Sequence, residues 1–177
     1  DQFSADLQAS IKMAMTQHGI AFIPGSAELG DFDATSTTIA LAPGAAQSIL
    51  PEGALDYTFE RYWREFEQRR TGTKEWKDYT PYELRTVGTF ARLGWRDRAQ
   101  SALEFFFDDQ QPREWNQWAE VVSPTPRKPC FVGDLAHAWV ASDYVRPALD
   151  LFAFERPEDE SIVLAAGIPE AWLAGEG

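Results

Sequence analysis

The sequence predicts an all-α protein built from helical hairpins, and two kinds of observation support that fold class. Apolar residues recur at helical spacing in several stretches of the chain. Polar loops that end in a helix start occur near residues 31, 80 and 134. These loops divide the chain into periods of roughly fifty residues, each long enough for about one pair of helices. We therefore expect about three helical hairpins stacked side by side, with the N-terminal ends of alternate helices gathered on one rim.

The N-terminal third contains one clear helix and one ambiguous segment. Leu7, Ile11 and Met15 recur every four residues, which predicts a helix over residues 4–18. A polar, glycine-rich stretch follows, and then residues 34–41 are apolar but rich in Thr and Ser. Those residue types are compatible with both a helix and a strand, so the sequence leaves this segment open.

Three helices are expected in the middle of the chain. The first covers residues 56–70, because its aromatic residues fall on one helical face. These aromatic residues are Phe59, Tyr62, Trp63 and Phe66. The second starts at Thr80, which has Pro81 at the first helical position and Glu83 three residues after the cap. The third covers residues 96–107 and follows so closely that the two should form an antiparallel hairpin.

The C-terminal third should contain a long irregular stretch and a last helix. Residues 108–133 show no helical period, and loops of this length inside a domain are usually functional or disordered. The last helix is expected from residue 134 or later to Phe154, and Pro147 should kink it or mark a late start. The short apolar run at residues 162–165 predicts a strand.

Composition limits the possible functions. With 177 residues, 44% of them hydrophobic and 25% charged, the chain should fold as one globular domain over residues 1–177. A net charge of −12 argues against binding to nucleic acid or to an anionic membrane surface. The single Cys130 excludes an internal disulfide, and with only two histidines it argues against a structural zinc site. We expect no cofactor and no metal.

Carboxylates, amides and aromatic side chains gather in the loops expected on the rim. Aromatic faces stack on sugar rings, and amides, carboxylates and imidazoles hydrogen-bond to sugar hydroxyls. A glycosidase also needs one protonated and one ionised carboxyl group beside the scissile bond. The rim candidates are Asp31, Asp33, Tyr79, Tyr82, Glu83, Trp115, Asn116, Gln117, Trp118, Glu120, Asp134 and His137. This combination predicts a carbohydrate site.

Most of these candidates also have a purely structural explanation. Asp33 would equally serve as a cap for a helix starting at Ala34, and Glu83 fits a capping box by its spacing alone. Asp134 would cap the last helix, and His137 would then be a hydrogen-bonded core residue. The segment from Trp115 to Glu120 favours function, because two tryptophans and two amides in six residues are costly to bury without partners.

Four strings of residues also carry a resemblance to a known family. The strings are Gly30–Thr37, Asn116–Glu120, Gly133–Val140 and Ala165–Pro169. They resemble the C-terminal part of bacterial six-hairpin glycosidase-like proteins, some of which are described as coagulation factor 5/8 type after an attached sugar-binding module. The resemblance implies an (α/α)6 toroid, about half of it present in this chain, and action on glycosidic bonds by hydrolysis or, as the lesser alternative, by phosphorolysis. Ala136 and Ala141 depart from the Pro and Gly expected in relatives.

Site roles follow from rim position and chemistry. Glu120 is the first choice for the general acid, because Trp115 and Trp118 lie close before it in the sequence, and Asp134 is the preferred base acting through water. Inverting chemistry of this kind needs carboxyl groups about 6.5–9.5 Å apart. Glu83 and Asp33 are the reserve catalytic residues. The residues expected to hold sugar are Trp115, Asn116, Gln117, Trp118, Tyr82 and His137.

The expected partners are a carbohydrate and a missing N-terminal part of the same chain. The sequence begins at Asp1, as a processed chain or a piece of a longer protein would. Half a toroid would expose apolar faces, so self-association is also expected. The alternative reading is a non-catalytic helical module that binds glycan or packs on the rest of its own protein, and the isolated chain is expected to be inactive.

Overall fold

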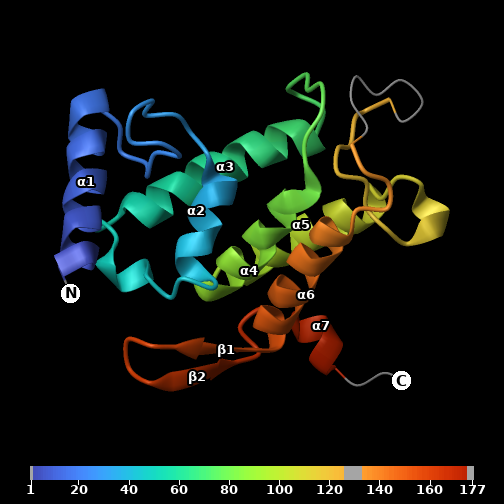
Figure 1. Cartoon of the computed structure of the whole chain (residues 1–177). Helices are drawn as coiled ribbons and strands as arrows, with labels where there is room; N and C mark the ends of the chain where they lie inside the picture. The colour runs from blue at the N-terminus through green and yellow to red at the C-terminus, as the bar shows by residue number, and fades with distance from the viewer. Residues whose placement is uncertain (1, 126–132, 175–177) are drawn as a thin grey trace. The chain divides into compact units, whose positions relative to one another are not determined.

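The computed structural model describes residues 2–125 and 133–174, and within them the chain is mainly helical with one small two-stranded sheet (Figure 1). This confirms the helical fold class. Contacts group the chain into two compact units, Asp1–Gln68 and Arg69–Gly177, which we describe separately. None of the helices in the described ranges combines the length and the hydropathy that crossing a membrane would need.

The element bounds agree with the periodicities of the sequence at most positions. The α-helices are α1 (Gln2–His18), α2 (Ala34–Leu41), α3 (Ala54–Arg70), α4 (Arg85–Arg92), α5 (Arg96–Asp108), α6 (Ala138–Phe152) and α7 (Glu170–Leu173). Short 3-10 turns are η1 (Gln47–Ile49), η2 (Pro81–Leu84) and η3 (Arg113–Trp115), and the strands are β1 (Ala153–Arg156) and β2 (Ser161–Leu164).

In the first unit, the ambiguous segment at residues 34–41 is a helix because its N-terminus is capped. The side chain of Asp33 accepts a hydrogen bond from the backbone N–H of Ser36, and a cap of this kind is worth about 1 kcal/mol. The same unit packs Phe22 edge-on against Phe32 at 5.3 Å, and the guanidinium of Arg61 on α3 covers both rings. The cap and the aromatic pair fix the loop that precedes α2.

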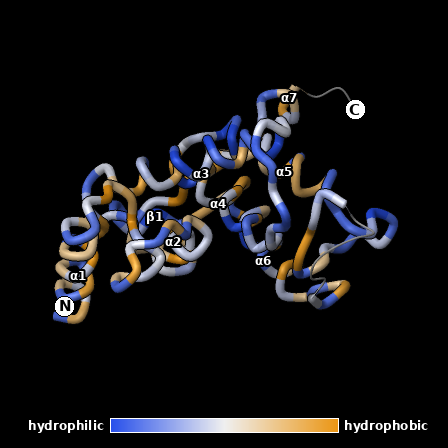
Figure 2. The backbone as a smooth tube through the Cα atoms, turned by 90° about the horizontal axis from the view of Figure 1, so that it is seen from above, coloured by the Kyte–Doolittle hydropathy of each residue, from blue (hydrophilic) through white to orange (hydrophobic). Residues whose placement is uncertain are grey.

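Helix α1 is only partly covered within its unit. Apolar and polar residues alternate along it (Figure 2), and Ala14 is its buried residue. Of the expected apolar face, Ile11 and Met15 are half-buried, whereas Leu7 is 45% exposed. The helix is therefore present as expected, but the face predicted to lie in the core is covered only at its C-terminal end.

In the second unit, α4 is the central helix. Val87 and Phe90 are fully buried, and α4 packs against both α5 and α6. Gly88 allows the close approach to α6, because a Cβ at this position would lie 3.0 Å from Oδ2 of Asp150 and 3.1 Å from Cα of Pro147. The connection from α4 to α5 is three residues long, and its Gly94 has a φ of +77°, which glycine adopts without strain.

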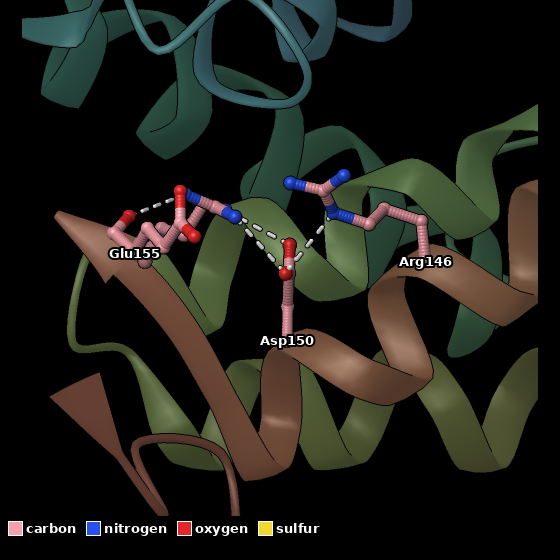
Figure 3. Close-up of polar contacts among 4 residues, drawn as sticks. Arg146, Asp150 and Glu155 are labelled. Carbon is pink, nitrogen blue, oxygen red and sulfur yellow. Dashed lines mark hydrogen bonds and ion pairs between the residues drawn. The ribbon is translucent and has the colours of Figure 1, made fainter. Parts of the chain in front are cut away.

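A buried ion pair joins α4 to α6. Arg92 donates to both carboxylate oxygens of Asp150, at 2.9 and 3.0 Å, and the two side chains are 5% and 3% exposed. Arg146 donates to Asp150 at 3.3 Å, and Arg92 also reaches the carbonyl of Glu155 on β1 (Figure 3). The network therefore connects α4, α6 and the hairpin that follows.

The C-terminal end of the last helix differs from the expectation. Helix α6 ends at Phe152, two residues before the expected end, and β1 pairs with β2 in an antiparallel hairpin with Ala153 opposite Leu164. The strand expected at residues 162–165 is thus confirmed as β2, and its partner was missed. Pro147 lies inside α6, where it is buried against α4 rather than marking a late start.

Candidate functional site

Four of the predicted site residues lie together in the second unit. Tyr82 comes from η2, Glu120 from the segment after η3, and Asp134 and His137 from the turn before α6. We call these four residues the Glu120 cluster. One ligand atom each from Glu120, Asp134 and His137 lies within 4.8 Å of the others. The sequence reasoning thus selected residues that lie close together in the fold. Tyr82 and His137 are in contact although 55 positions of sequence separate them.

Backbone hydrogen bonds position these side chains. The N–H of Glu120 donates to the carbonyl of Asp134 at 2.9 Å, and the N–H of His137 donates to the carbonyl of Trp118 at 2.8 Å. On the other side, Val122 and Tyr79 exchange two backbone bonds of 2.9 Å each. Segment 118–122 is therefore bonded to the turn before α6 and to Tyr79, which precedes η2, and this places Tyr82 beside His137.

The His137 side chain is hydrogen-bonded and mostly buried, whereas that of Asp134 is exposed. The Tyr82 hydroxyl lies 2.8 Å from Nε2 of His137, and the two rings meet edge to face. Nδ1 of His137 lies 3.6 Å from Oδ2 of Asp134, which is too long for a hydrogen bond. The His137 side chain is 12% exposed and that of Asp134 is 83% exposed. The imidazole is thus oriented by Tyr82 and faces an exposed carboxylate.

Charged and aromatic neighbours surround Tyr82. Trp139 packs edge-on against its ring at 6.1 Å, and the guanidinium of Arg85 lies over the ring at 5.4 Å while forming an ion pair with Asp143 at 2.8 Å. Partial burial raises the pKa of Tyr82 above its usual value, and the negative charges of Glu120 and Asp143 raise it further. The phenol therefore stays protonated at neutral pH and acts as a hydrogen-bond donor and acceptor.

Arg85, Asp143 and Trp139 are site residues that the sequence reasoning missed. Arg85 follows Tyr82 by three residues, and Trp139 follows His137 by two. Proximity in the sequence to a predicted site residue is the signal that could have found Arg85 and Trp139. The ion pair between Arg85 on α4 and Asp143 on α6 has no signature in the sequence.

Gly133 is required next to Glu120. Its φ is +61°, and a Cβ at this position would lie 2.7 Å from Cβ of Glu120, closer than real Cβ contacts. Any side chain here would displace Glu120 as well as straining the backbone. The glycine therefore lets the turn before α6 close over Glu120.

Glu120 and Asp134 lie next to each other. One oxygen of Glu120 and one oxygen of Asp134 lie within 4.8 Å of each other. Oε2 of Glu120 also accepts a hydrogen bond from the backbone N–H of Asp134 at 3.1 Å. Glu120 thus helps to fix the turn before α6.

Trp118 does not have the sugar-binding position expected for it. Its side chain is 4% exposed, and its indole N–H donates to the carbonyl of Phe106 at 2.9 Å. The ring packs against Phe107 and Tyr144 at 5.4 and 5.5 Å. Tyr79 is similarly buried, with its hydroxyl bonded to Asp109. Both residues belong to the core because their polar atoms are satisfied there.

Glu83 is engaged in an ion pair rather than directed to the cluster. It accepts two hydrogen bonds from Arg69, at 3.0 and 2.6 Å, and the two side chains are only 12% and 14% exposed. The expected capping box is absent, because Thr80 makes no side-chain cap bond. The reserve catalytic role of Glu83 is therefore replaced by a structural one.

Glu83→Ala is expected to lower the free energy of unfolding by about 1.5–3 kcal/mol, because it leaves the partly buried guanidinium of Arg69 without its bidentate acceptor. Urea titration followed by circular dichroism measures this. Glu75→Ala, at an exposed position, is the control and should change stability by less than about 0.5 kcal/mol. Equal stability of Glu83→Ala and the wild type would contradict the structural role.

The remaining predicted residues lie elsewhere. Asp33 caps α2 in the first unit, and Asp31 accepts a bond from the N–H of Ser26. Trp115 ends η3 with 56% of its surface exposed, Asn116 follows with a left-handed φ of 49°, and Gln117 is half-buried. Trp115 therefore remains available to stack on a ligand, whereas Asn116 has a role in the backbone turn.

No family model, curated protein or solved structure matches this chain.

Proposed function

We propose that this chain is part of a carbohydrate-active protein that acts on glycosidic bonds, and that the Glu120 cluster is its site. The observation that carries the proposal is the convergence of Tyr82, Glu120, Asp134 and His137 from three separate segments. Two carboxylates, an imidazole and a phenol in one place supply both the hydrogen bonds that sugar hydroxyls need and the proton transfer that bond cleavage needs.

An exposed aromatic ring beside the cluster supports binding to sugar. Trp139 packs on Tyr82 and is 62% exposed, so one face of its indole is open to solvent. Stacking on such a face buries the apolar side of a sugar ring while its hydroxyls reach the neighbouring polar groups. In this proposal Trp139 takes the role that the sequence assigned to Trp118.

The burial difference between the carboxylates supports their proposed roles. Glu120 is half-buried and its Oε2 accepts a hydrogen bond that fixes the direction of the carboxyl group, whereas Asp134 is exposed. We therefore assign Glu120 as the general acid. We assign Asp134 as the second carboxylate, which acts on the anomeric carbon either directly or as a base through water.

The proposed architecture is about half of an (α/α)6 toroid, completed by the rest of a longer chain. Exposed apolar side chains support this, because they follow one another along α6 and β2. They are Val145, Leu149, Phe152, Ile162 and Leu164, each more than half exposed. In the proposed whole protein they contact the remaining hairpins, and in the isolated chain they favour self-association.

The test is a screen of aryl glycosides and oligosaccharides against the full-length protein and against this chain alone. We expect turnover by the full-length protein and binding without turnover by the chain. Tyr82→Phe removes only the hydroxyl that holds His137, so it should weaken sugar binding while leaving the helical spectrum unchanged. Absence of both sugar binding and turnover in the full-length protein would contradict the proposal.

A second candidate function is a non-catalytic glycan-binding or structural module. The hydrogen bond from the N–H of Asp134 to Oε2 of Glu120 favours it, since that carboxylate already stabilises a turn. Sugar binding by the full-length protein without turnover of any glycoside would select this alternative.

A further inference from the structure

We propose that Glu120, Asp134 and His137 bind a divalent transition-metal ion, and that this binding requires no sugar. The inference goes beyond the proposed function, and its test does not depend on glycoside chemistry. Each of the three residues contributes one potential ligand atom, and these atoms lie within 4.8 Å of one another.

The spacing suits a single ion after a small movement. Ligand atoms bound at about 2.1 Å to one tetrahedral ion are about 3.4 Å apart, so atoms that now lie within 4.8 Å of one another need to approach by up to about 1.4 Å. The Asp134 side chain is 83% exposed and can make that movement without disturbing the core. Glu120 and His137 are half-buried and supply the fixed part of the site.

A separate observation is the hydrogen bond that orients the imidazole. Nε2 of His137 lies 2.8 Å from the Tyr82 hydroxyl, so when Nε2 carries the proton it donates to that oxygen. Nδ1 then presents its lone pair towards the Asp134 carboxylate at 3.6 Å. Metal-bound histidines are commonly held through their other ring nitrogen in this way. Lone pairs that face one another across such a gap are stabilised by a cation between them.

Glu120 is also held in the manner of a metal-binding carboxylate. Oε2 accepts the backbone N–H of Asp134, which fixes the orientation of the carboxylate, and each of its oxygens has further lone pairs. Gly133 has no side chain to displace it. The site thus has one oriented imidazole, one oriented carboxylate and one exposed carboxylate.

The donor set selects the class of ion. Imidazole favours zinc, copper, iron and nickel, whereas carboxylates favour magnesium, calcium and manganese. A mixed set of one nitrogen and two carboxylates therefore fits Mn²⁺ and Zn²⁺ better than Ca²⁺, which takes six to eight oxygen ligands. Three protein ligands leave coordination positions for water or another oxygen ligand.

A cation bound to Glu120 would occupy the same carboxylate oxygens that carry the proton of the proposed general acid. If the proposed function is correct, excess Mn²⁺ should therefore inhibit glycoside turnover, and a chelator should restore it. This consequence rests on the proposed function, whereas the binding of the ion does not.

The experiment is isothermal titration calorimetry of the chain, and of the full-length protein, with MnCl₂, ZnCl₂ and CaCl₂. We expect one Mn²⁺ per chain, with weaker binding of Ca²⁺. Tyr82→Phe, which frees the imidazole, should weaken Mn²⁺ binding about 10–100-fold. Asp134→Asn and His137→Gln should weaken it more, and circular dichroism confirms that each variant is folded.

The matched control is Glu158→Gln, which removes the same charge from an exposed position before β2. Because the chain carries a net charge of −12, non-specific attraction would affect all cations and all acidic variants alike. Equal affinity for Ca²⁺ and Mn²⁺, more than one ion per chain at similar affinity, or equal effects of Glu158→Gln and Asp134→Asn would overturn the inference. Ion binding without sugar binding would support the metal site and contradict the proposed function. Sugar binding without ion binding would support the proposed function and contradict the metal site.

Discussion

Asp150→Ala is expected to lower the free energy of unfolding by about 3–5 kcal/mol, because it leaves the guanidinium of Arg92 buried without its partner. The two side chains are 5% and 3% exposed, and Arg92 donates to both oxygens of Asp150. Truncation also removes the packing of the Asp150 carboxylate against Gly88 of α4. Urea titration of the chain, followed by far-ultraviolet circular dichroism, measures the change.

Two further variants separate the buried charge from the rest of the network. Arg146→Ala removes a donor that is 55% exposed, so it should cost less than about 1 kcal/mol. Replacing both partners, in Arg92→Met with Asp150→Leu, should recover most of the loss, because no uncompensated charge remains. If Asp150→Ala and Arg146→Ala lower the free energy of unfolding equally, the buried ion pair is not what joins α4 to α6.

Glu120→Gln is expected to lower kcat of the full-length protein on its glycoside by about 10²–10⁴-fold, since the amide is nearly isosteric but cannot donate the proton. Sugar binding should be largely retained. Stability should change little, because the amide oxygen still accepts the N–H of Asp134. Steady-state kinetics with a range of aryl glycosides measure kcat and KM separately, and the loss should be greatest for poor leaving groups.

The kinetic experiment needs a chelator arm and a charge-matched control. A loss of kcat that persists in EDTA belongs to the proton donor, whereas a loss seen only with Mn²⁺ would assign Glu120 to the ion alone. Glu160→Gln changes the net charge equally from an exposed turn and should keep full activity. Near-normal turnover by Glu120→Gln in EDTA would exclude Glu120 as the general acid.

The sequence was most informative where local chemistry decides the structure. Helical spacing predicted α1, α3, α5 and α6, because an apolar face at the period of a helix is a property of neighbouring residues. The same reasoning left residues 34–41 open, and there the cap supplied by Asp33 decides for a helix. The same reasoning extended the last helix past Phe152. It missed β1, because the pairing of β1 with β2 depends on residues that follow the turn.

For the candidate site, the sequence by itself determined which residue types lie in the loops, and four of its predicted residues form the Glu120 cluster. Only the tertiary structure decided which of the other candidates could join them. Glu83 has the charge of a catalytic residue, but the fold places it against Arg69. Trp118 has the ring of a sugar-stacking residue, but the core between α5 and α6 covers it. Residue type is local, whereas burial, ion pairing and the separation of two carboxylates depend on segments far apart in the chain.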